Sequence, residues 1–444
     1  MATSSTLATD IDGRHASVIA RSRRQAYAPI AIFAAILLYL TYAFFAFDIP
    51  RLLSSSKLER GALLATDSFA HKVHVTKTMR SGEVKISVEG QRDAVYDTPP
   101  DWITITGDVV DVDLGKGFRS VIDGRTLTLL APDNPPIVVT IGDDAITADS
   151  TAPLPAWAKV NDRRFEARPS LFQRVFITRG RIQVFRYFYG WEHFFFAFNS
   201  PFFGKSIGEL FHLATSAERM DTARSNVAYI ASEYWYNPEW QHGEVFTALL
   251  ETIIMAFLGT MVAAIVGLPL AFLAAANFNP VWILRMGIRR LFDFLRGIDM
   301  LIWSLIFIRA FGLGPLTGIM AIAFTDTGTL GKLFSEAIEN IDNKQVEGVR
   351  STGASAVQRY RFGVIPQILP VIISQTLYYL ESNTRSATVI GALGAGGIGL
   401  KLVESLQTHS DWENTLYIII LTLAVVILMD IFSGWLRRRL IVTS

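Results

Sequence analysis

The stretch Glu347–Pro370, EGVRSTGASAVQRYRFGVIPQILP, is a polar segment between two long apolar runs. Gly353 lies six residues after Glu347, and Pro366 lies thirteen residues after Gly353. Glycine readily ends a helix, and proline restricts the chain that enters the next one. The pattern therefore predicts a helix–turn–helix that lies outside the membrane and contacts a partner protein.

The apolar runs around this segment predict a membrane protein. A helix needs about 20 apolar residues to cross the hydrocarbon core of a bilayer. Half of the 444 residues are hydrophobic and only 18% are charged, which argues against a wholly soluble chain. About six spans are expected, at Tyr27–Phe47, Val245–Ala276, Leu291–Phe311, Pro315–Ile338, Val364–Ile390 and Thr415–Leu436.

The remaining composition excludes several functions. The formal net charge of +1 gives no case for nucleic acid binding. Because the chain has no cysteine, disulfides, thiolate catalysis and cysteine-ligated zinc are excluded. The histidines show no metal-binding spacing, so no metal site is expected. A membrane enzyme would need a nucleophile–base pair or a metal ligand set, and the sequence shows neither.

The basic residues orient the predicted spans. Short loops with Lys and Arg stay on the cytoplasmic side. Such residues fall before the first run, in the loops after the second and fourth runs, and after the sixth, as in Arg289, Arg350 and Arg438. We therefore expect residues 1–26 and the C-terminus on the cytoplasmic side of a bacterial inner membrane. Residues 27–48 read as a signal anchor rather than a cleaved signal peptide, since no convincing cleavage site follows.

Residues 49–200 form a polar, β-rich insert that this topology places in the periplasm, and residues 201–244 connect it to the second span. Alternating segments predict a small sandwich or barrel of six or seven strands. Asn134–Pro136 is expected to be a turn. The strands are expected at Lys72–Thr76, Glu83–Glu89, Trp102–Thr106, Val109–Leu114, Thr126–Leu130 and Ile137–Ile141.

Three features of the insert have two readings each. The aspartates at 108, 111 and 113 fit a calcium site less well than a solvated strand face. His71 and His74 would face opposite ways on a strand, which disfavours a metal site. The aromatic segment Leu171–Phe203 is either a helix at the membrane interface or an aromatic core that joins the insert to the helices.

A glycine-rich stretch follows the fifth span, Gly391–Leu402, GALGAGGIGLKL. It contains G-x-G-x-x-G, but it follows a membrane helix rather than a strand, so nucleotide binding is not expected. We expect tight turns and close helix contacts that form an outer gate loop. The gate residues are Gly391, Gly394, Gly396, Gly397 and Gly399. Since the chain has no P-loop, another subunit must hydrolyse any ATP that drives it.

Ionisable residues inside membrane spans are costly and usually face the bundle interior. Glu381 and Arg385 have i, i+4 spacing, which suits either an intrahelical ion pair or a pore-lining arginine. Arg296 and Asp299 are a second possible pair, and Arg309 and Asp326 are further candidates. The expected translocation pathway is Glu381, Asn383, Thr384, Arg385, Ser386, Arg296 and Asp299.

The segment Glu347–Pro370 resembles the E-A-A…G…P loop of ABC importer permeases. Glu347, Gly353, Ala354, Ser355 and Pro366 match that pattern, whereas Gly348 and Val349 replace its two alanines. The segments LGKLFSEAIENID (Leu330–Asp342) and RSATVIGALGAGGIG (Arg385–Gly399) are similar to the phosphonate and phosphite permease subfamily. The resemblance covers residues 245–440 and leaves the β-rich insert unmatched.

This resemblance implies an α-helical polytopic membrane protein with a permease core at 245–440 and a coupling loop at 339–366. It implies a homodimer with two ATPase subunits, a periplasmic substrate-binding protein and contact with membrane lipid. The chain itself would bind no cofactor, because ATP and Mg are bound by the ATPase. The expected solute is a phosphonate or related phosphorus oxyanion. The alternatives are a permease for another solute such as methionine, or a membrane sensor with a periplasmic β domain.

Overall fold

The computed structural model describes residues 27, 29–54, 58–91, 94–408 and 411–441. The chain divides into two units, Met1–Leu63 and Leu64–Ser444. In the first unit, the helix Pro29–Ala46 is long and apolar enough to cross a membrane, and none of its side chains is buried. It is followed by α2 (Ile49–Ser54). The predicted cytoplasmic segment 1–26 lies outside the described residues.

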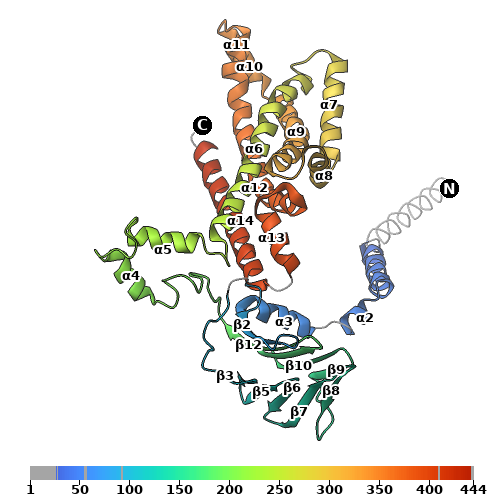
Figure 1. Ribbon diagram of the computed structural model, residues 1–444. Helices are drawn as coiled ribbons and strands as arrows, with labels where there is room; N and C mark the ends of the chain where they lie inside the picture. Colours follow the sequence, from blue (N-terminus) through green and yellow to red (C-terminus); the bar gives the residue numbers. More distant parts are fainter. Residues whose placement is uncertain (1–26, 28, 55–57, 92–93, 409–410, 442–444) are drawn as a thin grey trace, which may run out of the picture. The chain divides into compact units, whose positions relative to one another are not determined.

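The second unit begins with two antiparallel sheets of six strands each (Figure 1). Helix α3 (Leu58–Phe69) precedes them. The first sheet has the order β2-β1-β12-β11-β10-β9 and the second runs β3 to β8 in sequence. The strands of the first sheet are β1 (Ala70–Thr78), β2 (Val84–Val88), β9 (Ala158–Asn161), β10 (Arg164–Ser170), β11 (Gln173–Thr178) and β12 (Arg181–Tyr189). Those of the second are β3 (Ile103–Thr106), β4 (Val109–Gly115), β5 (Phe118–Asp123), β6 (Thr126–Ala131), β7 (Asn134–Ile141) and β8 (Ile146–Asp149).

Alternating side chains from both sheets form one core, which makes this region a β-sandwich. Val75 and Phe165 from the first sheet and Val110 and Leu127 from the second are fully buried in the same cluster. A sandwich was one of the two predicted architectures, but the predicted number of six or seven strands was wrong. Two of the missed strands, β11 and β12, hold arginine and aromatic residues on their outward faces. Asn134–Pro136 is the start of β7 rather than a turn, with the turn at the two preceding residues.

An aromatic cluster joins the segment after β12 to the membrane helices. The rings of Phe194 and Trp240 have centroids 4.8 Å apart, and those of Trp191 and Trp240 are 5.1 Å apart. His242 is hydrogen-bonded at 2.7 Å to the carbonyl of Phe194 and at 2.8 Å to the hydroxyl of Tyr417. Of the two alternatives predicted for Leu171–Phe203, the structure therefore shows the aromatic core. Helices α4 (Ile207–Thr215) and α5 (Asn226–Trp235) lie between Phe203 and the first long helix.

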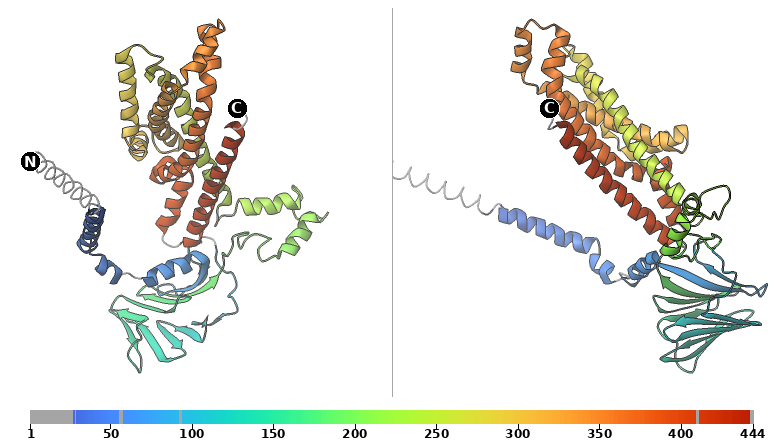
Figure 2. Two further views of the ribbon diagram at one scale, coloured as in Figure 1. Left: turned by 180° about the vertical axis from the view of Figure 1, so that it is seen from behind. Right: turned by 90° about the vertical axis from the view of Figure 1, so that its left-hand side faces the viewer.

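The rest of the unit is helical, and its helices run side by side (Figure 2). The long helix α6 (His242–Ala274) packs along α9 (Pro315–Glu339) through small residues. A Cβ at Gly259 would meet Ile322 at 2.6 Å, and one at Gly267 would meet the backbone of Gly331 at 3.3 Å. Without a hydrophobic driving force in lipid, such close contact is a main source of helix association. The other long helices are α12 (Ile365–Ile390) and α14 (Trp412–Ile441).

The predicted third span, Leu291–Phe311, is not one helix. The chain forms α7 (Trp282–Gly297) and α8 (Met300–Phe311), with a break at Ile298 and Asp299. The carboxylate of Asp299 accepts a hydrogen bond from the backbone N–H of Leu301 at 2.8 Å and caps α8. Asp is a strong helix N-cap because it satisfies a backbone donor that has no partner within the helix. The apolar run was therefore read as continuous where a capping residue interrupts it.

Four helices among the described residues are long and apolar enough to span a membrane. They are Pro29–Ala46, α6, the helix that includes α12, and α14. Helix α9 has 25 residues but also carries several charged groups near its end. The fold is thus that of a polytopic membrane protein with a β-rich region.

Candidate functional site

The segment predicted to contact a partner forms two short helices at one end of the helical bundle (Figure 1). These are α10 (Asn343–Ser351) and α11 (Ala356–Arg359). Asp342 caps α10 by accepting from the N–H of Lys344 at 2.9 Å, and Ser355 with Gln358 forms a reciprocal capping box on α11. Gly353 between them has φ +80, a conformation that favours glycine. The predicted helix–turn–helix is confirmed.

This helix–turn–helix exposes apolar side chains around a hollow. The hollow has a volume of about 600 Å³, and Gly348, Val349, Gly353, Ala354 and Phe362 are among its lining residues. Val357 is 74% exposed and Phe362 is 61% exposed. An exposed apolar group beside a concave surface is typical of a protein contact. Glu347 is exposed on α10 of the same segment, whereas Pro366 lies in the first turn of α12.

The two short helices are fixed to α12 by backbone and amide contacts. The side chain of Gln367 accepts a hydrogen bond from the N–H of Asp342 at 2.8 Å, and it donates one to the carbonyl of Gly363 at 2.5 Å. Gly363 approaches Val346 so closely that a Cβ would lie 3.2 Å from its Cα. Between α11 and α12 the chain forms a π-helical turn, Tyr360–Val364. The start of α10 is therefore connected directly to α12.

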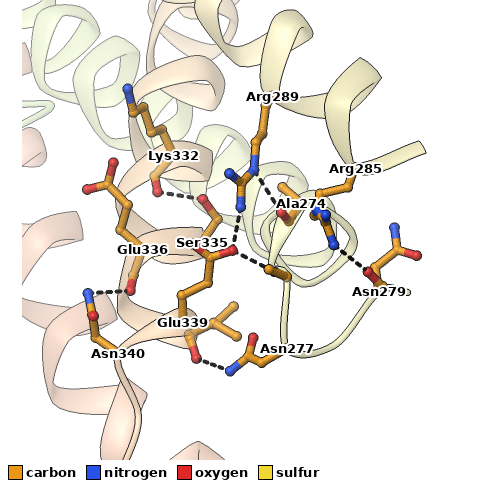
Figure 3. Close-up of polar contacts among 12 residues, drawn as sticks. Ala274, Asn277, Asn279, Arg285, Arg289, Lys332, Ser335, Glu336, Glu339 and Asn340 are labelled. Carbon is orange, nitrogen blue, oxygen red and sulfur yellow. Dashed lines mark hydrogen bonds and ion pairs between the residues drawn. The ribbon is translucent and has the colours of Figure 1, made fainter. Parts of the chain in front are cut away.

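A second network ties the end of α9, directly before α10, to the connection between α6 and α7 (Figure 3). The carboxylate of Glu339 accepts hydrogen bonds from the N–H of Ala276, at 2.5 Å, and from the guanidinium of Arg289. Arg289 also donates to the carbonyl of Ala274 at 3.1 Å, and Asn277 donates to that of Ile338 at 2.8 Å. These backbone groups lie at the ends of α6 and α9, where helical partners are missing.

Arg289 was predicted only as one of the basic residues that orient the spans, and its contact with Glu339 was not predicted. Arg289 and Glu339 are 50 residues apart, and no local pattern relates them. The only available signal was an acidic residue at the end of a predicted span opposite a basic loop. The contact could not be predicted because it depends on how two distant segments pack in three dimensions.

A buried polar cluster joins α6, α9 and α12 within the bundle. Asn383 donates hydrogen bonds to the carboxylate of Asp326 and, at 2.8 Å, to the hydroxyl of Thr260. Each of these three side chains is at most 2% exposed. The adjacent Thr384 is also buried and donates to the carbonyl of Leu380 at 3.0 Å. The structure thus brings together two predicted candidates, Asn383 and Asp326, through a contact that was not predicted.

The proposed ion pairs of the predicted pathway are not formed. Glu381 and Arg385 make no ion pair with each other in the part of the chain that the structure describes, and Arg385 is exposed whereas Glu381 is half-buried. Arg296 pairs with Asp293 at 3.0 Å rather than with Asp299. The reason is that Asp299 lies beyond the end of α7 and caps α8. Arg309 is exposed near the end of α8, and Ser386 is half-buried beside Arg385.

The glycine-rich stretch forms a compact turn between two helices. After a π-helical turn, Gly391–Ala395, helix α13 (Gly397–Thr408) begins. Gly394, Gly396 and Gly397 have φ of +112, +85 and +70. A Cβ on Gly399 would overlap the carbonyl of Thr388, so close packing requires glycine there. The carboxylate of Glu251 accepts from the N–H of Gly397 at 3.0 Å, and the hydroxyl of Thr252 accepts from that of Ile398 at 2.9 Å.

The described ranges contain no group of three or more His, Asp or Glu side chains that could hold a metal ion. In the β-sandwich, Asp111 pairs with Arg119, and Lys77 donates to Asp108 at 2.5 Å. Asp108 and Asp111 therefore pair with different basic side chains, and Asp113 accepts from the backbone N–H of Gly115 at 2.8 Å.

Comparison with known proteins shows the family to which the chain belongs. Residues 267–442 match the family described as "Binding-protein-dependent transport system inner membrane component". The chain is 38% identical to the phosphite transport system permease protein PtxC of Stutzerimonas stutzeri over 191 residues, which are 43% of this chain and 69% of that protein. The chain belongs to this family of permeases.

Two further relatives match this permease. The phosphate-import permease protein PhnE of Mycolicibacterium smegmatis is 38% identical over 43% of this chain and 36% of its own length. A putative cryptic phosphonate transport system permease protein of Escherichia coli K12, PhnE2, is 43% identical over 28% of this chain and its own full length. This permease is therefore a membrane subunit of an ABC transporter rather than an enzyme.

Proposed function

We propose that this permease carries a phosphorus oxyanion, a phosphonate or phosphite, into the cell as part of an ATP-driven importer. The observation that carries the proposal is the exposed helix–turn–helix of α10 and α11 with its hollow of mixed polar and apolar lining. A groove on an ATPase subunit would receive this surface, with Glu347, Gly348, Gly353, Ala354 and Ser355 at the contact. The ATPase would bind ATP and Mg, and this chain would bind no cofactor.

The two networks around the helix–turn–helix support a mechanism for coupling. A force on α10 reaches α12 through Asp342 and Gln367. It reaches α6 and α7 through the end of α9, where Glu339 contacts Ala276 and Arg289. Three of the elements that meet here carry the buried cluster of Thr260, Asp326 and Asn383. Closure of the ATPase subunits would thus change the packing of α6, α9 and α12 together.

The assembly proposed here is a homodimer with two ATPase subunits and a periplasmic substrate-binding protein. A dimer is expected because one chain carries one coupling segment. The other possible arrangement is a heterodimer with a second permease. In that case, the second permease chain would co-purify with this one. Both termini and the coupling segment would lie in the cytoplasm, with the β-sandwich in the periplasm and lipid around the spans. No role in binding nucleic acid is proposed.

The substrate class follows from the relatives and from one exposed cation. The relatives are named for phosphite, phosphate and phosphonate, which share a tetrahedral phosphorus with anionic oxygens. Arg385 is exposed on α12 and makes no ion pair with Glu381. A guanidinium forms charge-assisted hydrogen bonds with such oxygens. Arg385 and Ser386 are therefore the proposed pathway contacts, while Gly391–Gly399 would form the outer gate.

The proposal is tested by deleting this chain from a cell that has no second uptake system. The deletion strain is expected to lose growth on a phosphonate or phosphite as sole phosphorus source while it grows on phosphate. Normal uptake of labelled phosphonate and phosphite would reject the substrate assignment. Loss of methionine uptake instead would assign the permease to another solute.

A further inference from the structure

The outward face of the first sheet, on the side opposite the sandwich core, is rich in cations. The register places His74 of β1 beside Ser87 of β2 and Phe185 of β12, and places Phe185 beside Arg174 of β11. One row away on the same face, the register pairs Lys85 with Thr76. Since side chains alternate along a strand, all of these point away from the core that contains Val73 and Val75.

The residues named on this face, except Thr76, line a cavity of about 430 Å³. That volume lies within the range of about 300–1,000 Å³ that is typical of small-molecule sites. The polar lining groups include the side chains of His74, Lys85, Ser87, Arg174, Arg181 and Gln183. One carboxylate, that of Glu89, also lines the cavity, and it already pairs with Lys72 at 3.6 Å.

The charges of this face are unbalanced. Arg174 pairs with Glu166 at 3.2 Å and stacks on Phe176 and Phe185. Lys85 and Arg181 are exposed and form no ion pair with any residue that the structure describes. Burial is the main cause that lowers the pKa of His74 to about 4, and the nearby charges of Lys85 and Arg181 act in the same direction. Two cations without an ion pair among the described residues therefore lie near one half-buried imidazole.

Buried polar atoms in the cavity also lack partners. Nε2 of His74 is hydrogen-bonded to Ser87 at 3.2 Å, but its Nδ1 is buried with no hydrogen-bond partner among the described residues. Nε of Arg174 is likewise buried and unsatisfied. Leaving such a group without a partner costs about 1–3 kcal/mol, so native proteins usually satisfy it. Both atoms belong to side chains that line the cavity.

We propose that this cavity binds a phosphate-type oxyanion, held by Lys85, Arg181, Arg174 and His74. Oxyanions accept several hydrogen bonds at once and bind most strongly to charged donors. The cavity offers two unpaired cations, a guanidinium stacked on aromatic rings and an imidazole. The source of the oxyanion is either a free phosphate or phosphonate, or the headgroup of an anionic phospholipid. The site is separate from the membrane helices and does not depend on the proposed transport.

The test measures equilibrium binding of radiolabelled inorganic phosphate, with methylphosphonate as competitor, to the full chain in nanodiscs of phosphatidylcholine without an ATPase. The Lys85→Gln/Arg181→Gln variant is expected to bind at least tenfold more weakly. The matched control is Lys116→Gln/Arg163→Gln, which removes two exposed turn cations outside the cavity and should bind as the wild type does. Lys85→Arg/Arg181→Lys keeps both charges and should retain binding, which separates loss of charge from misfolding.

A second arm distinguishes the source of the oxyanion. Native mass spectrometry of the chain released from nanodiscs with phosphatidylglycerol counts the retained anionic lipids. Loss of one lipid in the Gln variant, without phosphate binding by the wild type, assigns the site to a headgroup. Phosphate binding that the Gln variant loses assigns it to a free oxyanion. Equal phosphate binding and lipid retention in the wild type and the Gln variant would overturn the proposal. Because no ATPase is present, failure of transport cannot produce any of these outcomes.

Discussion

Asn383 of α12 donates a hydrogen bond to the carboxylate of Asp326 on α9, and both side chains are buried. The same amide donates to Thr260 of α6, so one side chain connects three helices. Asn383 and Asp326 are each only 2% exposed, so water does not replace their contact. A buried acid is costly unless it is hydrogen-bonded, which makes this amide important for the packing of the bundle.

Replacing Asn383 alone is therefore expected to destabilise the protein. Asn383→Leu should lower the free energy of unfolding by about 2 kcal/mol, because Asp326 loses its donor. Adding Asp326→Leu should recover part of that loss, because two apolar groups then replace two polar ones. SDS-induced unfolding in detergent measures each value. Ser382→Ala is the control, since Ser382 makes no side-chain hydrogen bond to the described residues. Strictly additive losses in the double variant would contradict this account.

The turn between α10 and α11 requires glycine at 353. Gly353→Val places a β-branched residue at φ +80, which is expected to cost about 1–2 kcal/mol locally and to distort the turn. We expect loss of ATPase co-purification and of substrate-driven ATP hydrolysis. Gly208→Ala is the matched control, because Gly208 lies within α4 away from this segment, has open space around its Cα and adopts no such φ. Full transport and unchanged co-purification of Gly353→Val would reject the docking role of this turn.

The contact of Glu339 with Arg289 and Ala276 should matter for coupling more than for assembly. Glu339→Ala removes the acceptor for both donors, and we expect a stability loss of about 1 kcal/mol because the pair is partly exposed. The number of solute molecules imported per ATP hydrolysed in proteoliposomes should fall. Glu336→Gln, at an exposed carboxylate one turn earlier, should leave this ratio unchanged. An unchanged ratio for Glu339→Ala would remove this network from the coupling path.

Arg385 is exposed and has no ion pair with Glu381, which separates the roles of the two residues. Arg385→Gln is expected to lower uptake in proteoliposomes at least tenfold while assembly stays intact. Glu381→Gln should have little effect on either. The double variant should behave like Arg385→Gln alone. Wild-type uptake by the double variant would show that Arg385 does not contact the solute.

Stability should fall in acid because of His193. Burial, and then the neighbouring His71, lower the pKa of His193 to about 4. Its Nδ1 lies 2.6 Å from the side-chain oxygen of Gln91. The unfolded chain takes up a proton near pH 6.5 and the folded one does not, so the contribution is complete above pH 6.5 and is lost as pH falls toward 4.

The expected slope from this group is at most about 1.4 kcal/mol per pH unit. His193→Asn should make the dependence shallower between pH 6.5 and 4, and asparagine tolerates the positive φ of 56 at this position. Unfolding followed by tryptophan fluorescence across this pH range measures the difference. Equal slopes for the wild type and His193→Asn would contradict the assignment.

Much of the helical fold could be read from the sequence because long apolar runs and loop charges follow one-dimensional rules. Helices α6, α9, α12 and α14 lie where these runs are. The helix–turn–helix could also be predicted, since glycine and proline act on the local backbone. The break at Asp299 could not, because a cap depends on where a helix begins rather than on hydropathy. Strands such as β11 and β12 were missed because their outward residues are arginines and aromatics.

The contacts that organise the candidate site could not be predicted at all. Asn383 and Asp326 are separated by 57 residues, and Glu339 and Arg289 by 50. No local spacing indicates either pair. Conversely, the i, i+4 spacing of Glu381 and Arg385 suggested a pair that the side chains do not form. Spacing along one helix says which side chains are neighbours, but packing against other helices decides which of them meet.

The turn at Gly391–Gly399 has the glycine spacing of a dinucleotide-binding loop, followed by a helix. In that kind of fold, the positive end of the helix and its free N–H groups hold a phosphate. In this permease those first N–H groups are already bound, one to the carboxylate of Glu251 and the next to the hydroxyl of Thr252. The protein thus supplies an internal anion from α6 at the position that a phosphate would occupy, and so a nucleotide-like sequence becomes a joint between two membrane helices.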